Sequence, residues 1–411
     1  QRAGQVFGLK YLLASQSALL WMGVLVWVAT LFHWIGLWAS RGGEGAAGLP
    51  AGQPADGGSG DSAAATAQMG AAPGHGAAKH LPQAPIPSRF HLQPHPQPHS
   101  QFQTQPHMAQ RLGTRLAWVA VALGLIGSGV RWYESYLLNP QAGHIPLSNL
   151  YEVFVLFIWM TLLFGLYFES RRQARGLNAF VLLLVSAAVA FVFWYSATRQ
   201  GQLIQPLVPA LQSWWMKLHV PANFVGYGLF ALAAMAGLVS LLKTASARAL
   251  WLGLVGLPLL VAAVLAGLAH GLGWAPAQLG TLTRMVLLLA AVLAALIALR
   301  RPLNPRTPTE AVLDDVMYKA IATGFAFFTI ATFTGALWAA EAWGAYWSWD
   351  PKEVWALIVW LNYASWLHLR LVKGLRGRLA AWWALAGLVV VTFAFVGVNL
   401  FLGGMHSYGR I

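Results

Sequence analysis

The chain has 411 residues, of which 58% are hydrophobic and only 9% are charged. Soluble domains carry about 25% charged residues, so this composition excludes an ordinary soluble protein and predicts a membrane protein. The formal net charge of +14 would favour nucleic-acid binding in a soluble protein, but here Lys and Arg cluster in short segments between apolar runs, as in membrane proteins, and we expect no nucleic-acid partner.

Ten apolar runs are long enough to cross a bilayer core about 30 Å thick as helices. In chain order they cover residues 11–38, 116–132, 150–168, 177–195, 222–242, 250–270, 282–299, 320–338, 354–371 and 379–402. The sequence therefore predicts an all-α, polytopic integral membrane protein with about ten transmembrane helices.

Composition divides the chain into three regions. Residues 1–40 hold the first transmembrane helix, and residues 111–411 form the polytopic domain. Between them, residues 41–110 are rich in Gly, Ala, Pro, Gln and His and have too few large apolar side chains for a core. We expect this segment to be disordered. Its six histidines fit a low-complexity tract, with weak metal or haem capture as the alternative; they are His75, His80, His91, His95, His99 and His107.

The loops predict the orientation. If the helices alternate, four basic loops fall on one side, which the positive-inside rule assigns to the cytoplasm. Their residues are Arg171, Arg172 and Arg175; Lys243 and Arg248; Arg300, Arg301 and Arg306; and Arg370, Lys373, Arg376 and Arg378. The opposite loops contain His144, His219, His270, residues 343–355 and His406. We therefore expect an inner (cytoplasmic) membrane protein whose residues 343–355 face the periplasm or cell exterior.

Residues 343–355, which we call the Trp segment, hold four tryptophans and a tyrosine. The tryptophans are Trp343, Trp347, Trp349 and Trp355. Asp350, Pro351 and Glu353 have the spacing of a helix N-cap, first residue and capping box. One interpretation is an aromatic belt followed by a capped helix. The other, favoured by the density of indoles, is a flat apolar platform for a large planar ligand whose charged rim could meet Lys352.

Three histidines are candidate iron ligands. His219 and His406 lie on the expected outer side, before one apolar run and after the last, and two imidazoles commonly ligate the iron of a planar macrocycle. His368 lies 17 residues after Pro351, about 26 Å along a helix, near the inner leaflet. Ionisable residues inside a membrane are candidates for function. His33 reaches a similar depth on the first helix and is a weaker candidate of the same kind. Chemistry does not separate His144 and His270 from ordinary loop residues.

The motif Trp-Gly-x-x-Trp-x-Trp-Asp-x-Lys-Glu-x-Trp of the Trp segment resembles the WWD signature of haem-handling membrane proteins. Its continuation through Trp360, Leu361, Tyr363 and His368 is similar to the CcsA (ResC) family of System II cytochrome c biogenesis. Stretches 131–135, 143–152, 219–227 and 404–409 resemble the same family. The resemblance covers roughly residues 115–411.

The resemblance implies a function. Such proteins act with a CcsB (ResB)-like membrane protein as a cytochrome c synthase, or haem lyase. Haem b passes from the cytoplasmic side to the outer WWD site, where it forms thioethers with the Cys-x-x-Cys-His motif of apocytochrome c. The resemblance assigns His219 and His406 as outer axial ligands and His368 to an inner haem site whose other ligand comes from the partner. The tryptophans and Asp350 would contact the porphyrin.

Two departures and two alternatives accompany this hypothesis. Residues 41–110 and an extra helix pair near 250–299 are not part of the family pattern. The main alternative is a haem carrier or exporter of the CcmC/CcmF type, without attachment activity. A transporter of another substrate class would leave the paired outer histidines unexplained.

The chain has no cysteine. This fits a synthase whose thiols come from the apocytochrome, and it excludes a thiol nucleophile of the chain's own.

Overall fold

The computed structural model describes residues 2–40, 107–140, 143–172, 174–271, 273 and 276–405. These residues form helices and loops, and no strand occurs among them. Most of the predicted disordered segment, with five of its six histidines, lies outside the described residues. The sixth, His107, is the N-cap of a helix, and its side chain accepts a hydrogen bond from the backbone N–H of Ala109.

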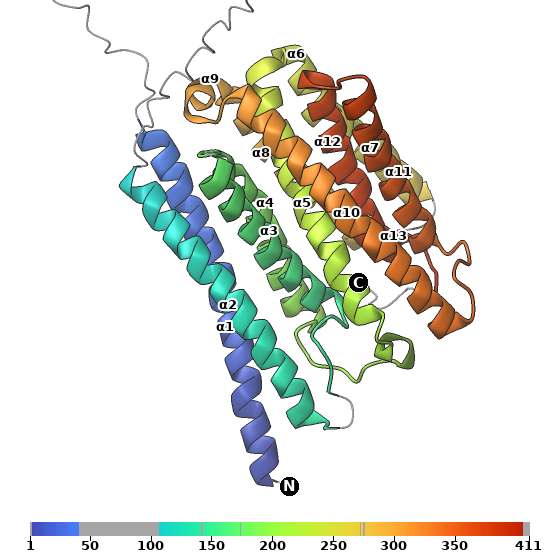
Figure 1. Cartoon of the computed structure of the whole chain (residues 1–411). Coiled ribbons are helices and arrows are strands. Elements are labelled where there is room, and N and C mark those ends of the chain that lie inside the picture. The colour runs from blue at the N-terminus through green and yellow to red at the C-terminus, as the bar shows by residue number, and fades with distance from the viewer. Residues whose placement is uncertain are drawn as a thin grey trace, which may run out of the picture. The chain divides into compact units, whose positions relative to one another are not determined.

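Figure 1 shows the helices, which pack side by side in a bundle. Their bounds are α1 Arg2–Ala39, α2 Met108–Leu138, α3 Leu150–Arg172, α4 Leu177–Arg199, η1 Pro209–Gln212, α5 Met216–Thr244, α6 Ala247–Leu250, η2 Trp251–Gly256, α7 Leu257–Gly271, α8 Pro276–Ala298, α9 Arg300–Leu303, η3 Asn304–Arg306, α10 Glu310–Trp343, α11 Pro351–Val372, α12 Gly377–Thr392, η4 Phe393–Gly397 and α13 Val398–Phe401. The η2 and η4 segments are π-helical, and η1 and η3 are 3-10 turns.

The prediction of an all-α polytopic membrane protein is confirmed. Within the described part of the chain, eight helices are long and apolar enough to cross a membrane, or nine if the bent pair Thr283–Ala298 and Arg300–Arg306 forms one span. The predicted run 354–371 corresponds to α11, which is not among the eight. Its 22 residues include Lys352, Glu353, His368 and Arg370, which lower its apolar character.

Helix α5 is the central helix of the bundle. It packs against α10, α12 and α3, and most of its side chains are buried. Gly237 allows a close approach of α5 to α12, because a Cβ there would lie 2.9 Å from the backbone oxygen of Ala381 on α12. Helices α1 and α2 form an antiparallel pair beside α3 and α4.

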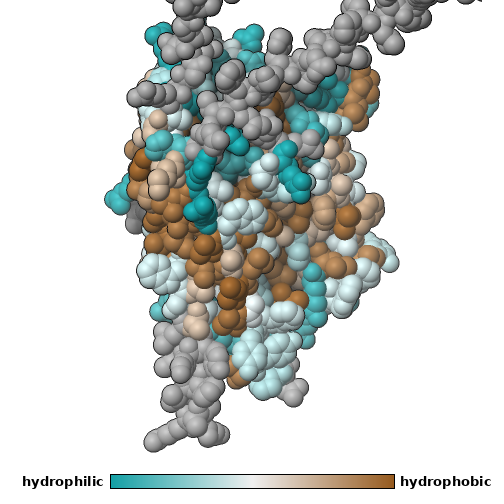
Figure 2. Space-filling view, turned by 60° about the vertical axis from the view of Figure 1, so that its left-hand side comes forward, coloured by the Kyte–Doolittle hydropathy of each residue, from teal (hydrophilic) through white to brown (hydrophobic). Residues whose placement is uncertain are grey.

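Chain segments that carry basic residues meet at one end of the bundle. The Lys243 ammonium donates to the Asn304 carbonyl at 2.5 Å, and Arg300 donates to the Ala245 carbonyl at 2.7 Å. Arg306 donates to the carbonyl of Ser40, just beyond α1. Figure 2 shows hydrophilic side chains gathered toward one end and apolar ones over the middle of the molecule. Because α5 is 29 residues long, its first turn lies roughly 40 Å from this basic end.

Most of the helices extend beyond the predicted bounds, and the extensions of α5 and α10 concern candidate site residues. The predicted helix 222–242 begins at Met216 instead, so His219 lies on α5 and not in a loop before it. Pro221 is the sixth residue of α5 and lies inside the helix, where its missing N–H removes one backbone hydrogen bond. Helix α10 continues to Trp343, five residues beyond its predicted end.

Candidate functional site

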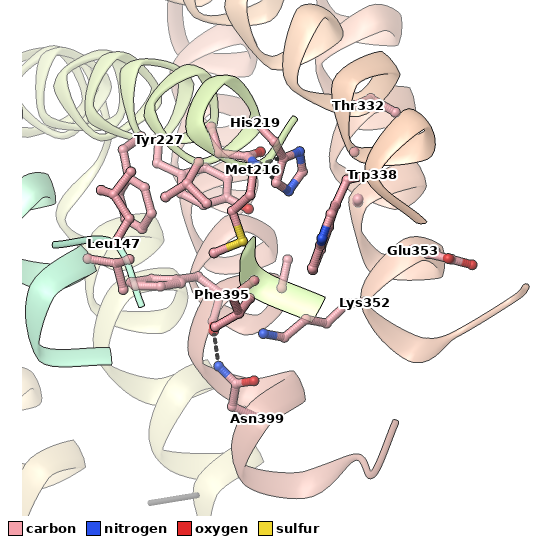
Figure 3. A pocket seen from close by; sticks show the side chains of 18 of the residues that line it. Leu147, Met216, His219, Tyr227, Thr332, Trp338, Lys352, Glu353, Phe395 and Asn399 are labelled. Atoms are coloured by element: carbon pink, nitrogen blue, oxygen red, sulfur yellow. Dashed lines mark hydrogen bonds between the residues drawn. The ribbon is translucent and has the colours of Figure 1, made fainter. Parts of the chain in front are cut away.

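A cavity of about 200 Å³ lies beside the first turns of α5, at the end of the bundle opposite the basic loops. Its wall is formed by the loop before α3, by α5, by the second half of α10, by the start of α11, and by η4 and α13. Apolar and aromatic side chains form most of this wall, and Figure 3 shows the main ones. His219, Asn223, Lys352 and Asn399 add polar groups.

His219 is held in one tautomer. Its Nδ1 lies 2.7 Å from the carbonyl oxygen of Ala331 on α10. Because a carbonyl can only accept, Nδ1 carries the proton and Nε2 keeps its lone pair. This is the arrangement in which a metal-ligating histidine donates its other N–H to a backbone carbonyl. His219 therefore has the chemistry of an iron ligand.

Two neighbours fix the His219 ring in place. Asn223, one turn further along α5, has its side-chain nitrogen 3.0 Å from His219 Nε2 and donates to that lone pair. On α10, Gly335 leaves space for the ring, since a Cβ there would lie 2.6 Å from His219 Cε1 and 2.7 Å from Nδ1. The Trp338 ring, next along the same face of α10, lies 5.8 Å from the imidazole between ring centroids.

The Lys352 side chain contributes a positive charge to the cavity wall. It extends from the first turn of α11 toward Phe395 and Asn399 (Figure 3). Asn399 donates its side-chain amide to the Phe395 carbonyl at 3.0 Å. A ligand in this cavity would meet imidazole and indole groups from α5 and α10, and an ammonium group from α11.

The predicted capping box of the Trp segment is confirmed. Asp350 is the N-cap of α11 and accepts from the backbone N–H of Lys352, and Pro351 is the first helical residue. The Glu353 carboxylate accepts from the backbone N–H of Asp350 at 3.1 Å and of Ser348 at 2.7 Å. These bonds hold Glu353, whose carboxylate points away from the neighbouring Lys352 in Figure 3.

The four tryptophans of the segment do not form one flat surface. Trp343 ends α10 and packs on Trp338 with ring centroids 5.1 Å apart, whereas Trp355 is on α11 and packs on Phe393 at 4.2 Å. Trp347 lines the cavity, and its ring meets that of Trp349 edge-on at 5.9 Å.

Trp349 is 71% exposed and has a φ of 58°, a left-handed conformation that is uncommon for a bulky residue. The segment therefore presents its indoles separately: one in the cavity, one to the outside and two against neighbouring helices.

The remaining predicted histidines are dispersed. His368 is on α11 near the basic end, on an exposed face shared with Ile358, Leu361, Ser365 and Val372. His406 lies outside the described residues, and the described chain ends at Met405, whose backbone N–H donates to Asp350 at 2.6 Å. The remaining three predicted histidines lie away from the cavity wall: His33 and His144 are buried, and His270 is exposed at the end of α7.

Sequence reasoning missed three residues around His219, namely Asn223, Gly335 and Trp338. Asn223 could have been found, because it follows His219 by four residues and shares its helix face. Ala331, Gly335 and Trp338 have the spacing of one face of α10, but only tertiary packing shows that this face meets α5.

Comparison with known proteins identifies the family. A family model described as Cytochrome C assembly protein matches residues 147–406. Proteins named Cytochrome c biogenesis protein CcsA from Nostoc punctiforme, Parasynechococcus marenigrum and Synechocystis sp. are 34%, 36% and 35% identical over 306, 280 and 289 residues. The matches cover 68% of this chain and 83%, 80% and 83% of those relatives. The chain belongs to the CcsA family. The predicted resemblance is confirmed, and with it a role in cytochrome c biogenesis.

The CcsA match contains the whole cavity. The first residue of the cavity wall, Leu147, is also the first residue of the matched region, and the last, Asn399, lies inside it. Helices α1 and α2 precede the matched region. The cavity and the Trp segment are therefore features of the part of the chain that the family model describes.

Proposed function

We propose that this chain is the haem-delivery and attachment subunit of a cytochrome c synthase, acting with a CcsB-like membrane protein. The observation that carries the proposal is His219, whose Nδ1–H is bound to the Ala331 carbonyl and whose Nε2 lone pair is on the wall of an aromatic cavity. This is the second-shell arrangement of a metal-ligating imidazole. Haem b is the substrate, and His406 is its second axial ligand at the outer site.

The cavity size supports a role in attachment. Its volume of about 200 Å³ is below the roughly 300–1,000 Å³ of pockets that enclose a drug-sized ligand. The described residues would hold one edge of the macrocycle, with an indole of Trp338 or Trp347 beside the ring and Lys352 beside a propionate. The other edge, including the vinyl groups, would remain accessible to apocytochrome c.

The attachment reaction needs reduced thiols and correct geometry. Each cysteine S–H of the apocytochrome adds across one vinyl C=C. A C–S bond forms at the carbon next to the ring, the proton goes to the terminal carbon, and no electrons are gained or lost overall. Holding the haem by two imidazoles while the peptide docks would supply much of the acceleration through proximity. The absence of cysteine from this chain prevents competing thioethers with the synthase itself.

The proposal also includes an inner haem site and the orientation of the chain in the membrane. The basic end of the bundle faces the cytoplasm by the positive-inside rule, which directs the Trp segment to the periplasm or cell exterior. His368, on the exposed face of α11 near that basic end, receives haem first, and its second ligand comes from the partner. The partner would cover this apolar face together with membrane lipid.

A spectrum tests the proposal. The full chain is purified with its CcsB-like partner from a host that lacks its own maturation system. We expect a bis-imidazole haem spectrum, and cytochrome c maturation in the same cells. His219→Ala and His406→Ala should each abolish maturation, with partial recovery on addition of imidazole. Normal maturation in both variants would contradict the proposal, and haem binding without maturation would favour the carrier alternative.

His368 is tested by haem occupancy. If it belongs to the inner site, His368→Ala should lower the amount of haem that copurifies with the complex and should not change the axial ligation of the haem that remains. Unchanged occupancy would contradict this part of the proposal. An exposed apolar residue two turns earlier on the same face, Leu361, provides the control in Leu361→Ala.

A further inference from the structure

A buried ion pair joins α2 to the start of α3. Arg131 on α2 donates from Nε to Oε1 of Glu152, in the first turn of α3, at 2.7 Å. The two side chains are 2% and 1% exposed, and neither residue is part of the cavity wall. Replacing a buried ion pair by apolar side chains of similar volume is often neutral for stability. The presence of two charges here therefore needs an explanation other than stability.

The second oxygen of the Glu152 carboxylate holds the loop before α3. Oε2 accepts from both the backbone N–H and the hydroxyl of Ser148, each at 2.8 Å. The side-chain oxygen of Asn149 accepts from the backbone N–H of Glu152 at 2.9 Å. Residues 147–150 are part of the cavity wall. One carboxylate thus connects α2 to the loop that forms this side of the cavity.

Helix α2 makes three further contacts in the same region. Arg131 donates from Nη1 to the carbonyl of Gln202, in the turn after α4, at 2.7 Å, and its guanidinium lies 5.3 Å from the centre of the Tyr151 ring. The hydroxyl of Ser135, one turn after Arg131, accepts from the backbone N–H of His144 at 2.9 Å. Helix α2 therefore holds the loop at both of its ends, although no residue of α2 is part of the cavity wall.

Leu147 connects this loop to the helix that carries His219. Its side chain belongs to a small buried cluster with Phe224 of α5, and Phe224 directly follows Asn223, which donates to His219. Tyr227 packs against the same cluster, and Figure 3 shows it with Leu147 on the cavity wall. A displacement of the loop would therefore change the shape of the cavity on this side.

We propose that Arg131 is a positioning residue that, through Glu152, holds residues 147–150 in place to pack against the macrocycle beside His219. The inference rests on the proposed function. A loop that becomes ordered only when a ligand binds lowers the affinity, because its lost entropy subtracts from the binding free energy. Charge-assisted hydrogen bonds in a buried site order the loop in advance. Apolar side chains could fill the same volume, but they could not hold the Ser148 N–H.

Glu152→Gln divides the two tasks of the carboxylate. Glutamine replaces one of the two acceptor oxygens by a donor, so it cannot serve both Arg131 and Ser148. We expect the variant, purified with its partner and titrated with haem b, to bind haem about tenfold less tightly. The spectrum of the bound haem should stay that of the wild type, because His219 keeps its contact with Ala331. Added imidazole should not restore the affinity.

Arg131→Met combined with Glu152→Met separates positioning from stability. Methionine fills a similar volume without a charge, and the double variant leaves no unpaired charge in the interior. We expect a thermal unfolding temperature close to that of the wild type, but the same loss of haem affinity as in Glu152→Gln. Hydrogen exchange of the backbone N–H groups of residues 145–150, measured without haem, should be faster in both variants.

Glu134→Gln provides the matched control. Glu134 is also buried on α2, one turn after Arg131, but its carboxylate accepts from the backbone N–H and the hydroxyl of Ser15 on α1. It makes no contact with the loop before α3 that would hold residues 147–150. We expect haem affinity and the exchange of residues 145–150 to match the wild type, whatever the effect on thermal stability.

The outcomes distinguish the inference from the proposed function. Wild-type haem affinity in Glu152→Gln, or in the double variant, would overturn the inference and leave the proposed function intact. If Glu152→Gln does not fold, the double variant alone decides. A wild-type complex that binds no haem, or a His219→Ala variant with an unchanged haem spectrum, would instead contradict the proposed function.

Discussion

The two nitrogens of His219 have different tasks because their partners differ. Nδ1 donates to a backbone carbonyl that cannot move independently of α10, which fixes the ring. Nε2 accepts from the Asn223 side chain, which can rotate. A bound metal would replace the second hydrogen bond and keep the first. The site is thus organised around one imidazole before any ligand is present, which lowers the cost of orienting it on binding.

Gly335→Ala should weaken haem binding. The added methyl group would lie 2.6 Å from Cε1 of His219, so the ring must move away from the Ala331 carbonyl. Loss of such a second-shell contact typically lowers metal affinity about 10–100-fold. Haem titration of the purified complex measures the change.

The control for this variant is Gly267→Ala on α7. A Cβ there has no atom within 4 Å, and alanine is the better helix former. We expect unchanged haem affinity and equal or slightly higher thermal stability. If Gly335→Ala bound haem as the wild type does, the ring would not be confined as the structure indicates.

Asn223→Ala should change the haem affinity in the opposite direction. The Asn223 amide occupies the lone pair that a metal would use, and a net hydrogen bond of about 0.5–1.5 kcal/mol must be broken on binding. Removing it should tighten haem binding about two- to tenfold. A fall in affinity would show that Asn223 contacts the haem itself. Titration of the variant against the wild type distinguishes the two outcomes.

At the scale of helices, α10 and α11 are joined at both ends of the bundle. At the end that carries the cavity, they are consecutive through the Trp segment. At the basic end, Arg370 on α11 forms a two-point contact with Asp314 on α10, at 2.8 and 2.5 Å, and also donates to the Leu375 carbonyl. The side chains are 9% and 22% exposed. Because His368 is two residues before Arg370, this pair also sets the position of the proposed inner ligand.

Asp314→Asn should therefore destabilise the chain. The variant removes the charge from a partly buried Arg370 contact, which we expect to cost about 1.5–3 kcal/mol. The neighbouring Asp315 pairs with Lys319 one turn away, and both are about one-third exposed. Asp315→Asn should change stability by less than about 0.5 kcal/mol. Thermal unfolding in detergent compares the two variants. Equal losses of stability would contradict the conclusion that the Asp314–Arg370 contact contributes more than the Asp315–Lys319 pair.

At the scale of the whole molecule, the sequence predicted the helices better than the site. Apolar runs about 20 residues long need only local information, and the Asp350-Pro351-x-Glu353 spacing predicted the start of α11 correctly. The platform of four indoles did not follow, because Trp343 and Trp355 belong to two helices that direct them at Trp338 and Phe393. The neighbours of each indole are determined by tertiary packing, which cannot be inferred from the spacing of residues along the chain.

The extra helix pair α7 and α8 differs from the rest of the bundle. No side chain of α7 is buried, and α7 packs mainly on α8 and η2. Among the side chains of these two helices that the structure describes, none is part of the cavity wall. The ends of the pair are close together in the fold, because the Arg300 side chain donates to the Ala245 carbonyl at 2.7 Å. The pair is therefore a hairpin added at the edge of the bundle.

Replacing residues 252–294 by a flexible linker of about eight residues should leave the haem site intact. Such a Gly/Ser linker has a mean reach of roughly 15 Å, enough to join neighbouring helix ends. Leu296 and Ile297, two buried residues near the end of α8, are retained. We expect a wild-type bis-imidazole spectrum with lower thermal stability, since lipid replaces a packed helix pair. Loss of the spectrum, with the remaining helices still folded by circular dichroism, would mean that the hairpin supports the site through contacts with the partner.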